Sequence, residues 1–140
     1  IHPNPKVHAT VFQYFGDRGD RVWLIEPLDY PKFLLAQQAA QFVVSDSGGV
    51  QEEAASMGVR VAIVREKTER PDAVTLGLTR IVGADAIGLI EAVDDFMTTP
   101  VDLDSVAKWR FLQGDGHAGT KAAAAIVERV AGDQVVLRRA

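Results

Sequence analysis

The residues best suited to chemistry lie at 42–53, where the sequence reads FVVSDSGGVQEE. Gly48 and Gly49 lack side chains, so a ligand could approach the backbone closely there. The first N–H groups of a helix have no partner inside the helix, and they attract anions. Together with the hydroxyl of Ser47, these groups form a candidate site for a diphosphate. The same residues would also form a good helix cap that binds no ligand.

Glu53 lies just behind these residues, near the start of the helix that we expect to follow them. A carboxylate beside a phosphate repels it unless the carboxylate faces another group. The two hydroxyls of a sugar would suit it, because a carboxylate accepts several hydrogen bonds. Glu53 is therefore a candidate for binding a ribose, and stabilisation of the helix dipole is the alternative interpretation.

A second polar segment, REKTERP at residues 65–71, follows another predicted strand. The carboxyl ends of parallel strands meet at one edge of a sheet, so this segment should lie near the Ser-Gly-Gly run. Arg70 could bind a phosphate through two parallel hydrogen bonds. Lys67 is interpreted as part of a solvated loop. The helical spacing of Phe33 is more typical of a core residue than of a site.

These residues need a framework that places the ends of strands next to the starts of helices. The apolar runs predict strands at 21–27, 41–45, 59–64 and 79–83. Helical patterns predict helices at 6–15, 29–39, 49–57, 84–97 and 116–132, a polar loop at 65–77, and a tail at 133–140 that is an edge strand, a packed arm or disordered. The alternation predicts an α/β fold, with a Rossmann-like parallel sheet and helices on both faces.

The composition excludes several classes of protein. The chain has 140 residues, 47% of them hydrophobic and 24% charged, with a net charge of −4, which suits one globular domain. Basic residues are not clustered, which argues against nucleic-acid binding, and no apolar run is long enough for a membrane span. The absence of cysteine excludes disulfides and fits a cytoplasmic protein. The histidines lack a metal-site spacing, so we expect no metal.

Four short motifs then point to a family. DSGGVQEEA, TERPDAV, HPNP and GDG, in this arrangement, resemble the carboxy-terminal domain of the non-hydrolysing UDP-N-acetylglucosamine 2-epimerases, from His2 to about Val130. The resemblance implies that 1–140 is that nucleotide-binding domain, one incomplete half of a GT-B two-domain fold, with the amino-terminal domain absent. The start on Ile1, without a methionine, also suggests a piece of a longer protein.

The resemblance carries specific roles onto this sequence. Ser47 and Gly48, with Gly49 beside them, match positions that bind the diphosphate of UDP. Glu53 matches the carboxylate on the ribose hydroxyls, and Phe33 matches an aromatic residue beside the uracil.

Two further positions match residues of the family. Arg70 matches an arginine of the substrate site, and His2 matches a histidine that in some bacterial members belongs to a regulatory UDP-N-acetylglucosamine site. The late loop departs from the family, because FLQGDG at 111–116 stands where Pro-Tyr-Gly commonly precedes Asp-Gly.

The implied reaction interconverts UDP-N-acetylglucosamine and UDP-N-acetylmannosamine by elimination and re-addition of UDP. It needs no cofactor, and its proton-transferring acids lie in the absent domain, so we assign no catalytic residue to this chain and expect it to be inactive alone. The full-length protein should be a cytoplasmic homodimer that binds UDP-N-acetylglucosamine and UDP, and neither nucleic acid nor membrane. Alternatives are the nucleotide-sugar half of a GT-B glycosyltransferase, a hydrolysing epimerase, a nucleotide-binding module without activity, and an inert fragment.

Overall fold

The computed structural model describes residues 1–16, 19 and 21–137. The strands are β1 (Phe42–Ser45), β2 (Arg60–Ile63) and β3 (Thr79–Ile81). The helices are α1 (Pro5–Phe15), α2 (Tyr30–Ala39), α3 (Gly48–Met57), α4 (Pro71–Thr75), α5 (Ala86–Thr98), α6 (Leu103–Leu112) and α7 (Ala118–Leu137). The helices predicted at 6–15, 29–39, 49–57 and 84–97 are thereby confirmed within one or two residues of their ends.

The three strands form one parallel sheet in the order β1-β2-β3. In this register Val43 lies beside Val61, which lies beside Thr79. The N–H of Val64 donates to the carbonyl of Ser45 at 3.1 Å, so the carboxyl ends of β1 and β2 lie side by side. The strands predicted at 41–45, 59–64 and 79–83 are confirmed, and the loops that follow the first two meet at one edge.

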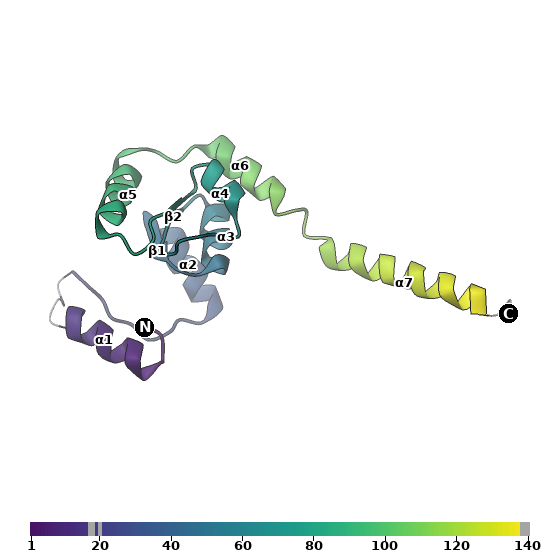
Figure 1. The fold of residues 1–140 in the computed structure, drawn as a ribbon, viewed down its shortest axis with the longest axis horizontal. Coiled ribbons are helices and arrows are strands. Elements are labelled where there is room, and N and C mark those ends of the chain that lie inside the picture. The colour runs from purple at the N-terminus through teal and green to yellow at the C-terminus, as the bar shows by residue number, and fades with distance from the viewer. Residues whose placement is uncertain (17–18, 20, 138–140) are drawn as a thin grey trace.

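Helices cover both faces of this sheet (Figure 1). On one face, Val61 and Ile63 of β2 pack with Ala54 of α3. On the other face, Ala62 packs with Phe96 of α5 in a separate cluster. The alternation follows from the pleat of a strand, which turns successive side chains to opposite faces. The predicted fold class, a Rossmann-like parallel sheet with helices on both faces, is confirmed.

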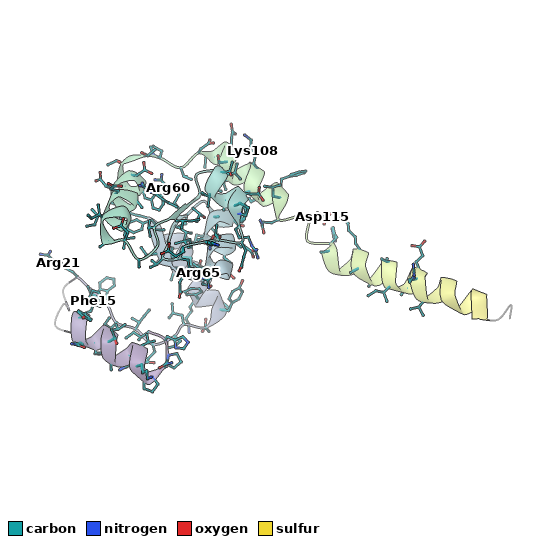
Figure 2. The ribbon with its side chains drawn as sticks, in the orientation of Figure 1. Phe15, Arg21, Arg60, Arg65, Lys108 and Asp115 are labelled. Atoms are coloured by element: carbon teal, nitrogen blue, oxygen red, sulfur yellow. The ribbon has the colours of Figure 1, made fainter. Side chains whose placement is uncertain are left out.

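Arg60, labelled in Figure 2, is a buried charge on the α5 face, and its guanidinium contacts the carboxyl end of that helix. Nη2 donates to the carbonyl of Phe96 at 2.6 Å and also to that of Thr99, and the guanidinium lies 4.6 Å from the centre of the Phe96 ring. The carbonyl of Phe96 lies in the last turn of α5 and that of Thr99 lies just beyond it, so neither has a partner within the helix. Arg60 therefore satisfies the end of α5 while it anchors the helix to the sheet.

The strand predicted at 21–27 is wrong for this structure. Residues 22–29 have no regular secondary structure, and Trp23 is 85% exposed. In the doubly wound strand order 3-2-1-4-5-6, strands 4, 5 and 6 lie side by side, as β1, β2 and β3 do here. The segment 21–27 comes before them in the chain and would correspond to strand 3. Strand 3 pairs with strand 2, and the described residues contain no strand that could take that place. The N-terminal amine of Ile1 donates a hydrogen bond to the carbonyl of Ile25 in this segment.

Two other expectations need correction. The polar loop predicted at 65–77 contains the short helix α4, which starts at Pro71 because proline is pre-shaped for a first helical turn. The tail from 133 was expected as a strand, arm or disordered segment, but α7 continues to Leu137. Residues 138–140 lie outside the described residues.

The two ends of the chain stand apart from this body (Figure 1). The helix α1 has no buried residue, and α7 extends away from the rest along its own axis. Asp115 lies in the connection between α6 and α7 (Figure 2), where its carboxylate accepts hydrogen bonds from Lys121 at 2.7 Å and from the His117 N–H at 3.0 Å. The packed part of the chain is thus the sheet with α2 to α6.

Candidate functional site

The first turn of α3 begins directly after β1, and Ser47 caps it. Ser47 is extended, with φ −88° and ψ 128°, and its Oγ accepts from the N–H of Val50 at 3.5 Å. Its own N–H donates to the hydroxyl of Ser45 at 3.1 Å. Both hydroxyls of the Ser-Asp-Ser run therefore shape the entry into the helix, which is the capping role expected from the sequence.

Gly48 and Gly49 have no evident role in the folding of this turn. Neither has a positive φ, unlike Gly58 at the other end of the helix, where φ is 82°. A Cβ built on Gly48 would meet no atom within 4 Å, and one on Gly49 would meet only the Ser47 hydroxyl at 3.9 Å. Glycine is also among the poorest helix formers. The space beside Gly48 and Gly49, where their side chains would lie at the start of α3, is therefore open.

Glu53 lies one turn further along α3, and α2 supplies a partner for each of its oxygens. Oε1 accepts the hydroxyl of Tyr30 at 3.1 Å, and Oε2 accepts Nε2 of Gln37 at 3.0 Å. The hydrogen bond to Glu53 raises the pKa of the Tyr30 phenol, and desolvation and the charge of the carboxylate add to this rise. The carboxylate is consequently held between α2 and α3.

Arg70 is tied to the same helix, although it lies eighteen residues after Glu52. Its Nε donates to Oε1 of Glu52, and the two side chains form an ion pair. Its N–H donates to Oγ1 of Thr68 at 3.1 Å, and that hydroxyl donates to Oε1 of the buried Gln51 at 2.8 Å. The loop after β2 is therefore fastened to the first two turns of α3.

The structure thus brings together most of the residues that the sequence singled out. Phe33 lies on α2 between the two residues that contact Glu53, three positions after Tyr30 and four before Gln37, and its side chain is 38% exposed. His2 lies elsewhere, exposed in the loop before α1, where its Nδ1 accepts from the N–H of Asn4 at 3.1 Å.

Sequence reasoning missed the residues that hold these side chains in place. Gln37 and Gln51 are both buried amides that contact the site, and Glu52 holds Arg70. Gln37 follows Phe33 by four positions, so the helical period places both on one face of α2. A polar residue at that position was the available signal, because a buried amide needs a partner.

Within the described part of the chain, no group of three or more acidic, histidine or cysteine side chains could hold a metal ion. No described helix combines the length and the apolar character that crossing a membrane would require. Around the start of α3, the described residues offer hydrogen-bond donors, with the carboxylates of Glu52 and Glu53 and the guanidinium of Arg70 nearby.

The sequence pattern that defines the UDP-N-acetylglucosamine 2-epimerases matches residues 1–127. This chain belongs to the UDP-N-acetylglucosamine 2-epimerase family. The family suggested by the four sequence motifs is thereby confirmed.

Curated relatives agree with this assignment but are much longer. The UDP-N-acetylglucosamine 2-epimerase of Bacillus subtilis is 36% identical over 121 residues, which are 86% of this chain and 32% of the relative. The Escherichia coli K12 enzyme of the same name is 36% identical over 118 residues, 84% of this chain and 31% of the relative. The chain spans about a third of the length of these epimerases.

Solved structures of the family have the same fold. The UDP-N-acetylglucosamine 2-epimerase of Neisseria meningitidis bound to UDP-N-acetylglucosamine has a TM-score of 0.66 at 29% identity, covering 91% of this chain and 35% of that one. An S. aureus protein solved with UDP has a TM-score of 0.65 at 34% identity, covering 75% and 27%. The Rossmann-like unit described above is accordingly one incomplete half of the GT-B arrangement of the 2-epimerases.

Proposed function

We propose that this chain is the UDP-binding part of a UDP-N-acetylglucosamine 2-epimerase. The observation that carries the proposal is the open start of α3, where glycine serves no need of the fold at Gly48. Glu53, on the same helix, is held by hydrogen bonds from α2, and Arg70 is held to that helix by its ion pair with Glu52. A phosphate, a sugar and an arginine partner could therefore be accommodated within a few helical turns.

In this proposal the ligand lies along α3 from its first turn to Glu53. The diphosphate contacts Ser47, Gly48 and Gly49, and the ribose contacts Glu53. The uracil lies beside Phe33 on α2.

Arg70 lies on the substrate side of the diphosphate in this proposal. Elimination of UDP places negative charge on the diphosphate as the bond to the sugar breaks. Backbone N–H groups, the Ser47 hydroxyl and Arg70 would stabilise that charge, because hydrogen-bond donors held in place by the fold need little reorganisation to meet it.

The whole protein would complete the reaction. We propose that an amino-terminal domain supplies the acids that remove and return the proton at C2, and that the full-length enzyme is a cytoplasmic homodimer serving cell-envelope polysaccharide synthesis. In this proposal 1–140 is the carboxy-terminal nucleotide-binding domain, and His2 belongs to a regulatory nucleotide-sugar site. No cofactor or metal takes part.

The test is a comparison of products in deuterated water. The full-length natural protein, given UDP-N-acetylglucosamine, should form UDP-N-acetylmannosamine with deuterium at C2, while the 140-residue chain should give no exchange above a blank. Release of free UDP without return would indicate a hydrolysing epimerase, and a transferred sugar would indicate a glycosyltransferase. Either result would overturn the proposed reaction, and C2 exchange by the short chain would overturn the role assigned to the absent domain.

A further inference from the structure

The two partners of Glu53 differ in how firmly they are held. Gln37, which donates to Oε2, is only 3% exposed and lies between α2 and α3. Tyr30, which donates to Oε1, is 60% exposed at the first position of α2. One carboxylate oxygen therefore faces an immobile donor inside the protein, and the other faces a donor at the surface.

The orientation of the Gln37 amide has a chemical cost. An ionised carboxylate only accepts hydrogen bonds, so the amide must turn its NH₂ toward Glu53. Its own Oε1 is then buried without a hydrogen-bond partner among the described residues. Buried acceptors are usually satisfied, and an unsatisfied one is destabilising. An apolar residue of the same length would fill this place without that cost, so packing alone does not explain the amide.

We propose that Gln37 is a positioning residue that fixes Glu53 for the ribose of a uridine nucleotide, and that Tyr30 occupies the same carboxylate only until the ribose replaces it. This inference rests on the proposed function, because it assumes that the ligand carries a ribose. The two oxygens of a carboxylate offer about four acceptor sites. Gln37 takes one from the buried side, which leaves the exposed sites for the two hydroxyls of the sugar.

Tyr30 suits a temporary role for the opposite reason. Its hydroxyl is at the surface, where water can take over the hydrogen bond when the side chain moves away. Removing this hydroxyl removes a competitor of the ribose, whereas removing the Gln37 amide releases the carboxylate from the orientation that the ribose needs. The two substitutions should therefore have opposite effects on nucleotide binding, although both remove one hydrogen bond to the same side chain.

The experiment measures the affinity of the full-length natural protein for UDP and for 2′-deoxy-UDP by titration calorimetry. The natural protein should prefer UDP by about tenfold or more, since one hydrogen bond to a charged group separates the two ligands. Gln37→Met keeps the length of the side chain and should bring this preference close to one, mainly by weakening UDP binding. Gln38→Met, at the exposed neighbouring position, is the matched control and should leave both affinities unchanged. Tyr30→Phe should strengthen UDP binding and keep or increase the preference.

Each contrary result identifies what is wrong. A preserved preference in Gln37→Met, an equal loss for both nucleotides, or a weakened UDP affinity in Tyr30→Phe would overturn the inference and leave the proposed function standing. Binding of UDP by the natural protein without any preference over 2′-deoxy-UDP would do the same. Failure of the natural protein to bind UDP would overturn both. Gln37→Leu, a second apolar replacement, is measured in parallel so that misfolding of one variant leaves the other to decide.

Discussion

The two tryptophans of this chain lie in two regions that differ in how far their apolar side chains are buried. Trp109, on α6, is 1% exposed and packs with Ala55 and Leu78 in a core cluster. Trp23, in the extended segment before α2, is 85% exposed. The buried residues of all three core clusters come from the span 54–109, and α1 contributes none. The packed body and the amino-terminal arm, residues 1–29, therefore have similar apolar patterns with different outcomes.

The difference teaches that an apolar pattern reports what a segment can bury, and that burial itself needs a partner. The helix α1 forms where its spacing predicts, with Asn4 as its cap and Pro5 in its first turn, yet Phe12 and Phe15 remain exposed. The helix α6 forms in the same way after its N-cap, Asp102, but it packs against α3 and α4. The capping signals specify the helices in both regions, and the neighbours decide the packing.

The largest expected effect would separate the two tryptophans. Trp109→Ala should lower the free energy of unfolding by about 3–5 kcal/mol, because it leaves a cavity in the core. Trp23→Ala should change it by no more than about 0.5 kcal/mol, because the ring is already in solvent. Urea unfolding of the 140-residue chain, followed by circular dichroism, measures both. Similar losses in the two variants would end the distinction between body and arm.

The next comparison sets two open glycines against each other. A Cβ would meet nothing within 4 Å at Gly48 of α3 or at Gly119 of α7. Gly48→Val should abolish the rise in melting temperature that excess UDP causes, with a nearly normal melt in its absence, because the side chain fills the ligand space. Gly119→Val should keep the UDP effect. A retained effect in Gly48→Val would rule out the diphosphate site, and a collapsed melt would mean that the glycine serves the fold after all.

Two glutamates, one in the body and one on α7, allow the same comparison for the affinity for UDP. Glu53→Ala should weaken UDP binding by roughly ten- to a hundredfold, the value of one hydrogen bond to a charged group. Glu128→Ala, on the exposed surface of α7, should leave the dissociation constant unchanged. Calorimetry on the full-length protein gives both constants. An unchanged constant for Glu53→Ala would return this residue to a purely helix-stabilising role.

The smallest expected effect is on the stability of the fold at low pH. Hydrogen bonds from Ser105 and the backbone of Asp104 lower the pKa of Asp102, and those from Lys121 and the backbone of His117 lower the pKa of Asp115. A carboxylate with a lowered pKa stabilises the fold above its ordinary value near 3.8, and this contribution is lost as the pH falls through the lowered pKa.

The two carboxylates should differ because α6 is packed and α7 is not. Asp102→Asn should remove part of the fall in melting temperature between neutral pH and about pH 3, since the group no longer titrates. Asp115→Asn should leave that fall as it is. Melting curves across this range test the pair, and a stronger effect of Asp115→Asn would show that α7 shares in the cooperative fold.

The strands predicted from the sequence also differ in outcome between the body and the arm. The strands of the body contain runs such as VAIV, whose two apolar faces are typical of buried parallel strands, and they lie where they were expected. The segment 21–27 has equally good strand signals, but no second strand lies beside it among the residues that the structure describes. A ladder is a property of two segments, so the composition of one cannot reveal whether the other is at hand.

The candidate site was predictable where backbone chemistry determines it. Ser47 caps α3 as the Ser-Gly-Gly run predicts, and the loop with Arg70 lies at the expected edge of the sheet. The supporting contacts were not predictable, because Gln37 and Glu52 meet their partners only through tertiary packing between α2, α3 and the loop after β2. Their distances along the chain, sixteen and eighteen residues, leave no local pattern to read.

The long hydrogen bond from Val50 to the Ser47 hydroxyl has a consequence for communication within the body. An oxygen that accepts from the helix still has its own proton to donate, and donation to an anion makes the same oxygen a better acceptor. A bound anion would therefore shorten the hydrogen bond from Val50 to Ser47 and stabilise the first turn of α3. Because α3 packs against α2, α4, α6 and the sheet, the ligand would join the contacts that hold this helix in the body. The Val50 amide would then exchange its hydrogen with solvent more slowly.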